Sequence, residues 1–265
     1  MVNSMIKELL ANIDLMFALA KNDLKARYSG SVLGILWSFV QPMVTVLVFW
    51  FVFQLGIRNP DVGGVEYILW FSAGFIPWTF FSDGVNMTSN VMTEYSYLVK
   101  KIKFKIWQLP IVKVMSASII HIVLVLVVLL MYLLYGHMPE ISWISVIFYS
   151  LATMILMMGI GFFVSSLAVL YVDVAQLISI VMQIGFWVSP IIWNKDSMGP
   201  VTLTILKLNP MYYIIEGYRD ALINGIGFWQ QSVGITVYYW VFTIVMFVVG
   251  VATYRKLRPH FADLL

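Results

Sequence analysis

The residues that could support catalysis are few and scattered. The chain has no cysteine, which excludes a thiol nucleophile, a disulfide framework and a cysteine-ligated metal. Metal-assisted chemistry would then need carboxylates and imidazoles at ligand spacing. The candidates lie far apart along the chain: Asp61, Glu140, Asp173, Asp196, His121 and His137. We therefore expect no catalytic residue and no metal site, and this disfavours a membrane glycosyl or phosphosugar transferase.

Non-covalent recognition by aromatic faces is a second kind of chemistry, and it is open to one short segment. Pro77 is followed by three aromatic residues and an acidic one, namely Trp78, Phe80, Phe81 and Asp83. Aromatic faces stack against sugar rings, but they also form the belts that anchor membrane proteins at the interface. Both interpretations stay open. Asp83 is expected to face a partner, a cavity or the outer interface, because a carboxylate is costly to place against lipid.

Composition places these residues in an integral membrane protein. Of the 265 residues, 61% are hydrophobic and 11% are charged, far from the usage of soluble domains. About 20 apolar residues cross the hydrocarbon core of a bilayer. Six apolar stretches approach or exceed this length and predict six transmembrane helices: residues 31–56, 67–91, 111–135, 143–171, 175–193 and 232–254. The first begins too late to be a cleavable signal peptide, so we expect it to remain in the mature protein.

The distribution of basic residues predicts the orientation of these helices. Lysine and arginine gather before the first stretch, around the second connection and after the last stretch: Lys7, Lys21, Lys25, Arg27, Lys100, Lys101, Lys103, Lys105, Lys113, Arg255, Lys256 and Arg258. Cytoplasmic loops carry such an excess. Both termini are therefore expected in the cytoplasm.

Residues 1–28 predict a helix of a different kind, lying in the inner membrane interface. Apolar residues recur there at spacings of three and four: Ile6, Leu9, Leu10, Ile13, Met16, Phe17, Ala20 and Leu24. Charged and polar residues mostly occupy the other face, which is typical of interfacial helices. The alternative is a helix that faces solvent and merely precedes the first span. Gly30 and Gly34, four residues apart, are expected on one helix face where another backbone can approach closely.

The second connection, residues 92–110, holds the densest basic cluster. Lysines alternate there with apolar residues, among them Lys100, Lys101, Ile102, Phe104 and Trp107. One interpretation is attraction of lysines to anionic headgroups. The other is a docking segment in which apolar anchors are surrounded by charge.

Residues 199–223 predict a re-entrant helical hairpin on the external side. Two apolar pieces, about 200–207 and 211–223, meet at Asn209 and Pro210. Each is too short to cross the membrane readily, and asparagine followed by proline favours a break between helices. Glu216 and Arg219 are three residues apart, so they either pair on one helix face or act in an external gate.

Three segments, in order, resemble ABC-type permeases that export lipid-linked polysaccharides, including O-antigen and wall teichoic acid transporters. They are Arg27–Trp37 continuing through Gln41-Pro42, Gly74–Gly84, and Leu208–Pro210 followed by Ile215–Arg219. In such permeases proline often follows the phenylalanine of the second connection, where this sequence has Lys105. The resemblance implies an all-α integral membrane fold, in which residues 1–265 form a single permease domain of a bacterial cytoplasmic membrane.

The resemblance also implies the partners of this chain. The functional assembly would contain two copies of the permease, as a homodimer, and two ABC ATPase subunits, among membrane lipids and without nucleic acid. The chain has no phosphate-loop pattern of glycine, four residues, glycine, lysine and serine or threonine. It is therefore expected to bind no cofactor itself and to have no ATPase site, with ATP and Mg²⁺ on the partner ATPase. A secondary carrier is disfavoured, because no convincing inverted repeat or pair of broken, charged helices is visible.

Site residues follow from the resemblance in three groups. Candidates for the substrate path are Arg27, Tyr28, Trp37, Trp78, Phe80, Phe81 and Asp83; for ATPase coupling, Lys100, Lys101, Ile102, Phe104 and Trp107; and for the external gate, Asn209, Pro210, Glu216 and Arg219. The favoured substrate is wall teichoic acid on an undecaprenyl diphosphate carrier, which would serve cell wall biogenesis. O-antigen or another lipid-linked polysaccharide is the alternative.

Overall fold

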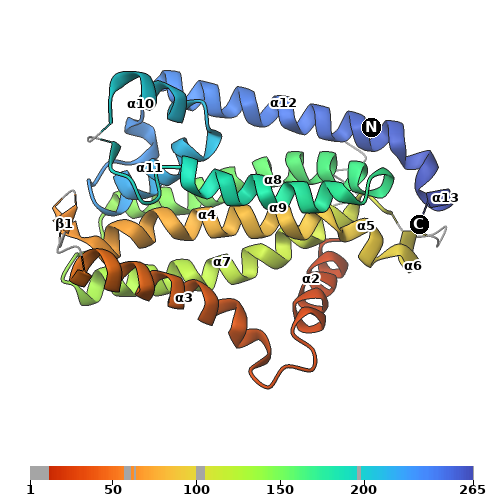
Figure 1. Ribbon diagram of the computed structural model, residues 1–265, viewed down its shortest axis with the longest axis horizontal. Helices are drawn as coiled ribbons and strands as arrows, with labels where there is room; N and C mark the ends of the chain where they lie inside the picture. The colour runs from red at the N-terminus through yellow and green to blue at the C-terminus, as the bar shows by residue number, and fades with distance from the viewer. Residues whose placement is uncertain (1–11, 57–60, 63, 100–104, 196–197, 265) are drawn as a thin grey trace.

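The computed structural model describes residues 12–56, 61–62, 64–99, 105–195 and 198–264, and it shows an elongated bundle of helices (Figure 1). The elements run in the order α2 (Ile13–Arg27), η1 (Gly34–Leu36), α3 (Trp37–Trp50), η2 (Phe51–Gly56), β1 (Asp61–Val62), β2 (Val65–Glu66), α4 (Tyr67–Ser89), α5 (Val91–Glu94), α6 (Ser96–Val99), α7 (Gln108–Leu134), η3 (Ile141–Ile144), α8 (Ser145–Leu170), α9 (Asp173–Val188), α10 (Pro200–Lys207), α11 (Pro210–Leu222), η5 (Phe228–Gln230), α12 (Val233–Leu257), η6 (Arg258–His260) and α13 (Phe261–Leu264). β1 and β2 form a two-residue antiparallel hairpin. The predicted helical fold class is confirmed.

Four helical segments in the described residues are long and apolar enough to cross a membrane. They are Gly34–Gln54, Gln108–Leu134, Ile141–Leu170 and Val233–His260. Their outward faces are rich in exposed leucine, isoleucine and valine, as expected of surfaces in contact with lipid tails. The chain is therefore a multi-pass membrane protein. Helices α4 and α9, which correspond to the predicted spans 67–91 and 175–193, are not among these four.

Helix α4 occupies the centre of the bundle (Figure 1) and is enclosed by its neighbours. Of its 23 residues, 19 are buried. A ladder of stacked rings joins it to α3: Phe71 lies 4.5 Å from Phe49, and Tyr67 lies 5.0 Å from Phe53, centroid to centroid. Because protein surrounds α4, it carries polar side chains that a lipid-facing helix could not carry cheaply.

Glycines set the close contact between α8 and α12. A Cβ placed on Gly159 would lie 2.8 Å from the backbone nitrogen of Phe247, and one on Gly250 would overlap the carbonyl oxygen of Gly159. The two backbones touch at this crossing, as small residues allow in membrane helix pairs.

The expectation that Gly30 and Gly34 share a helix face is wrong. Gly30 lies in the turn after α2 and Gly34 begins the short 3-10 helix η1, with φ of 84° and 53°. Glycine adopts positive φ at no steric cost, which makes it suitable for a reversal of the chain but removes it from a right-handed helix. The regular helix of this segment begins at Trp37, after the turn.

The predicted break between two short helices is confirmed. Helix α10 ends at Lys207 and α11 begins at Pro210. The side chain of Asn209 caps α11 by accepting a hydrogen bond of 3.0 Å from the backbone N–H of Met211. Its amide also donates to Ser189 Oγ at 2.8 Å, so the cap fastens α11 to the end of α9.

Candidate functional site

The predicted aromatic cluster lies inside the bundle. Trp78, Phe80 and Phe81 are each about 5% exposed. Phe80 stacks on the ring of His121 at 4.0 Å, and Trp78 fits against Gly185 of α9, where an added Cβ would lie 2.6 Å from the indole. In the single chain these rings pack neighbouring helices together, and their role in a substrate path stays a prediction.

The other substrate-path candidates lie on the surface of the chain. Arg27, Trp37 and Asp83 are exposed and Tyr28 is half-buried. Arg27 lies over the ring of Tyr28, with 5.8 Å between the guanidinium carbon and the ring centroid. The structure therefore separates this predicted set into three buried rings of α4 and four residues at or near the surface.

Arg219 of α11 is the centre of a buried polar network next to the break between α10 and α11. Its guanidinium donates to the carbonyl oxygens of Pro190 at 2.6 Å and Ile191 at 2.8 Å, and more weakly to that of Trp70 at 3.3 Å. It also lies over the indole of Trp70, 3.6 Å from the centroid. The pairing with Glu216 that the sequence left open is confirmed at 2.8 Å. Arg219 thus joins α11, α4 and the segment after α9 in one buried contact.

Lys195 extends this charge network toward the surface. Its ammonium lies 2.9 Å from Glu216. Burial opposes the charge of Lys195, but the carboxylate of Glu216 outweighs it and raises the pKa of Lys195 above its ordinary value. The pair borders a cavity of about 450 Å³ that also contacts Tyr212, Asp220 and Tyr238.

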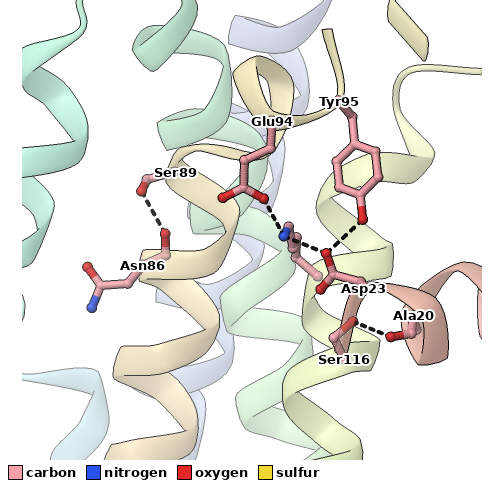
Figure 2. A network of polar contacts seen from close by, with 8 residues as sticks. Ala20, Asp23, Asn86, Ser89, Glu94, Tyr95 and Ser116 are labelled. Carbon is pink, nitrogen blue, oxygen red and sulfur yellow. Dashed lines mark hydrogen bonds and ion pairs between the residues drawn. The ribbon is translucent and has the colours of Figure 1, made fainter. Parts of the chain in front are cut away.

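A second polar network lies at the opposite end of the bundle, and Figure 2 shows it at close range. Lys113 of α7 is buried and bridges two acids, Asp23 of α2 at 2.6 Å and Glu94 of α5. The hydroxyl of Tyr95 donates to the same Asp23 oxygen at 2.7 Å. Burial and this contact with Asp23 raise the pKa of Tyr95, so its hydroxyl keeps its proton. The network fixes the N-terminal helix to the start of the second connection.

Sequence reasoning missed this network. In the sequence Lys113 is only one of the basic residues that indicate orientation, and no pattern there points to Asp23 or Glu94. Asp23 and Lys113 are 90 residues apart, so no spacing along one helix connects them. A charged residue within an apolar stretch was the available signal, since such a residue usually has a buried partner.

A cavity of about 560 Å³ adjoins this network. Its wall comes from α2, from the last turn of α4, from α5, α6 and α7, and includes Arg27, Asn86, Asn90, Glu94 and Tyr97. We call it the inner cavity.

Most of the ATPase-coupling candidates lie outside the described residues. This holds for Lys100, Lys101, Ile102 and Phe104. Trp107 is described and only 8% exposed, within a buried cluster that includes Met16, Met92 and Leu109. In the single chain it packs against the interior of the protein, and its role in ATPase docking stays a prediction.

Comparison of the sequence with known families identifies the class of membrane protein to which the chain belongs. The ABC-2 type transporter family matches residues 14–223, so this chain belongs to that family of membrane proteins. The chain is 26% identical over 254 residues, 95% of each protein, to the O-antigen export system permease protein RfbA of Klebsiella pneumoniae. It is 25% identical over 220 residues to the RfbA of Myxococcus xanthus, covering 81% of this chain and 82% of that protein. The polysialic acid transport protein KpsM of Escherichia coli is 22% identical over 242 residues, covering 90% of this chain and 91% of its own length. The resemblance to polysaccharide-export permeases is confirmed.

Proposed function

We propose that this chain is the permease subunit of an ATP-driven exporter that moves O-antigen or a related lipid-linked polysaccharide across the bacterial cytoplasmic membrane. One observation supports this more than any other: the similarity to O-antigen export permeases extends over 95% of both chains. The helical bundle and its lipid-facing outer surfaces are consistent with that function.

O-antigen replaces wall teichoic acid as the favoured substrate. The relatives reported above are named for O-antigen export and polysialic acid transport, and these names favour a polysaccharide cargo. The resemblance seen in the sequence motifs was common to both kinds of exporter and could not separate them.

The proposed topology has six spans, formed by α3, α4, α7, α8, α9 and α12. Helix α4 has 23 residues, about 34 Å at 1.5 Å per residue, which is sufficient for the hydrocarbon core. Helix α9 has 16 residues and would cross with local thinning of the bilayer or with its flanking residues. Helices α10 and α11 form the re-entrant hairpin, within a single permease domain.

The basic residues orient this arrangement. Figure 1 places α5, α6 and α13 at one end of the bundle and β1 and α10 at the other. The helices that flank the lysine-rich second connection and the basic last turn of α12, with Arg255 and Lys256, belong to the first of these ends. By the excess of basic residues in cytoplasmic loops, this end faces the cytoplasm and the hairpin faces outward.

The energy would come from a separate ATPase. ABC-2 permeases operate with ATPase subunits, and we propose that two ATPase copies, carrying ATP and Mg²⁺, act on a dimer of this permease. Asn209 caps α11 at Pro210, and the pair of Glu216 and Arg219 anchors this helix to its neighbours. We propose that movement of α11 opens or closes the external side.

Transport by the reconstituted complex tests this function. The permease and its ATPase are placed in vesicles with a lipid-linked O-antigen precursor or a lipid-linked teichoic acid precursor. We expect ATP-dependent delivery of the O-antigen precursor and less or none of the other. Absence of ATP-dependent movement of either precursor, in a complex that assembles and hydrolyses ATP, would refute the export function.

The second connection provides a separate prediction about coupling. Replacing Ile102 or Phe104 with aspartate should reduce ATPase association at least tenfold, because apolar docking area is lost and a charge must be desolvated. Co-purification of the two subunits measures this. Met138→Asp is the matched control, since Met138 is 79% exposed at the opposite end. Full ATPase binding by correctly inserted Ile102 and Phe104 variants would reduce the connection to a topological anchor.

A further inference from the structure

The cavity beside Lys195 and Glu216, which we call the outer cavity, has a polar wall in a largely apolar protein. It measures about 450 Å³ and lies between α10, α11, the segment after α9 and the first turns of α12. Tyr212, Glu216 and Asp220 follow one another at intervals of four residues along α11, and all three border the cavity. Residues four apart share a helix face. One face of α11 is therefore polar and forms part of a cavity of the size that holds small ligands.

Two opposite charges at the outer cavity lack a counter-charge. Asp220 is 9% exposed, and its carboxylate accepts hydrogen bonds from the neutral amides of Asn224 at 2.8 Å and Gln231 at 2.7 Å. Lys207, at the end of α10, is exposed and borders the same cavity. The ion pairs among the described residues include neither Asp220 nor Lys207, so these two also do not pair with each other.

These charges restrict the ligand that the outer cavity can hold. An anion would be attracted by Lys207 but repelled by Asp220, and a cation would meet the reverse. A neutral sugar would leave both charges without a partner. A zwitterion in which a phosphate is joined to an ammonium supplies both counter-charges. A carboxylate has about four acceptor positions, so Asp220 can accept from an ammonium in addition to the two amides.

The surroundings of the outer cavity favour a membrane lipid over a soluble zwitterion. Leu208 and Ile235 form the apolar part of its wall. On the two helices that flank it, Val201 and Ile205 of α10 and Val237 of α12 are exposed. Exposed apolar side chains of a membrane protein contact acyl chains. A phospholipid can therefore place its headgroup in the cavity and its chains along α10 and α12.

We propose that the outer cavity binds the headgroup of a zwitterionic phospholipid, with the ammonium on Asp220 and the phosphate on Lys207. Phosphatidylethanolamine has the required chemistry, because its primary ammonium donates hydrogen bonds. The bound headgroup joins α10 to α11 at the end of the bundle that holds β1 and α10 (Figure 1). This lipid site is separate from the exported cargo and does not depend on which polymer the complex moves.

Native mass spectrometry of the delipidated permease–ATPase complex tests the assignment. The probes are phosphatidylethanolamine, phosphatidylcholine and phosphatidylglycerol with identical acyl chains, and the water-soluble glycerophosphoethanolamine. We expect phosphatidylethanolamine to bind about tenfold more tightly than phosphatidylglycerol, since a hydrogen bond to a charged group has this order of effect. Phosphatidylcholine should fall between them, because its quaternary ammonium keeps the charge but donates no hydrogen bond. The soluble headgroup should bind at least about a hundredfold more weakly than phosphatidylethanolamine, because it lacks acyl chains.

Two variants assign the two parts of the headgroup. Asp220→Asn removes the charge that faces the ammonium and should abolish the preference for phosphatidylethanolamine. Lys207→Gln removes the partner of the phosphate and should weaken all three phospholipids about fivefold while keeping their order. Lys207 is exposed, so this second variant keeps the test decisive if Asp220→Asn fails to fold. The matched controls are Glu140→Gln and Lys256→Gln, both at exposed positions outside the cavity, and they should leave the three affinities unchanged.

Several results would overturn the proposal. Equal binding of the three phospholipids by the unmodified complex, or tighter binding of phosphatidylglycerol, would show that the ammonium is not recognised. Unchanged lipid binding by a folded Asp220→Asn or Lys207→Gln variant would exclude this cavity as the lipid site. Binding of glycerophosphoethanolamine as tightly as the lipid would assign the cavity to a soluble zwitterion instead. None of these results bears on export, which the vesicle experiment tests separately.

Discussion

Replacing Arg219 with methionine is expected to destabilise the protein by about 3–5 kcal/mol, the usual cost of removing one member of a buried ion pair. The loss has two parts. Among the described residues Glu216 keeps Lys195 as its one cationic partner, and the carbonyl oxygens of Pro190 and Ile191 lose their 2.6 Å and 2.8 Å hydrogen bonds. Methionine has a similar length but donates no hydrogen bond to replace them.

Unfolding by SDS titration from detergent micelles measures this change. Lys207→Met is the matched control, because Lys207 is an exposed cation of the same hairpin and should shift the midpoint little. Arg219→Lys should fall between the two: it keeps the charge toward Glu216 but cannot reach several carbonyls with a planar fork. An unchanged midpoint for Arg219→Met would show that the buried network around this guanidinium does not stabilise the hairpin.

The contrast between Glu216–Arg219 and the rest of this network shows what sequence can and cannot predict. Their pairing follows from helical spacing, because residues three apart share a face. The contacts of Arg219 with Trp70 and Pro190 cross 149 and 29 residues of chain. They depend on how α11 docks against α4, which no local pattern encodes.

The helices themselves were predictable in proportion to how much lipid they face. The stretches at 143–171 and 232–254 agree closely with α8, Ser145–Leu170, and α12, Val233–Leu257, because continuous apolar sequence leaves no alternative in a membrane. The first stretch, 31–56, contains the described span Gly34–Gln54, but composition does not show that the chain turns at Gly30 and has positive φ at Gly34. Only their backbone angles do so.

The candidate site was less predictable, for a related reason. Aromatic residues such as Trp78 and Phe80 look alike in sequence whether they line a path or fill a core, and the structure buries them. The inner cavity arises where α2 meets α5 and α7. Its residues have no common spacing, so tertiary packing alone brings Asp23, Glu94 and Lys113 together.

Replacing Gly250 with valine is expected to destabilise the protein by about 3 kcal/mol, at the upper end of overpacking costs. Helices α8 and α12 form the most extensive helix pair of the bundle, and a side chain at Gly250 would meet the backbone carbonyl of Gly159. Backbone atoms cannot rotate aside as a flexible side chain can, so the two helices must separate and lose packing along their length.

Gly234→Val, on the same helix, is the control, because a Cβ there meets only Ser232 Oγ at 4.0 Å. SDS unfolding should show a large shift for Gly250→Val and little for Gly234→Val, with Gly250→Ala between them. Equal shifts for the two valine variants would mean that helix propensity, rather than the contact between α8 and α12, sets the effect.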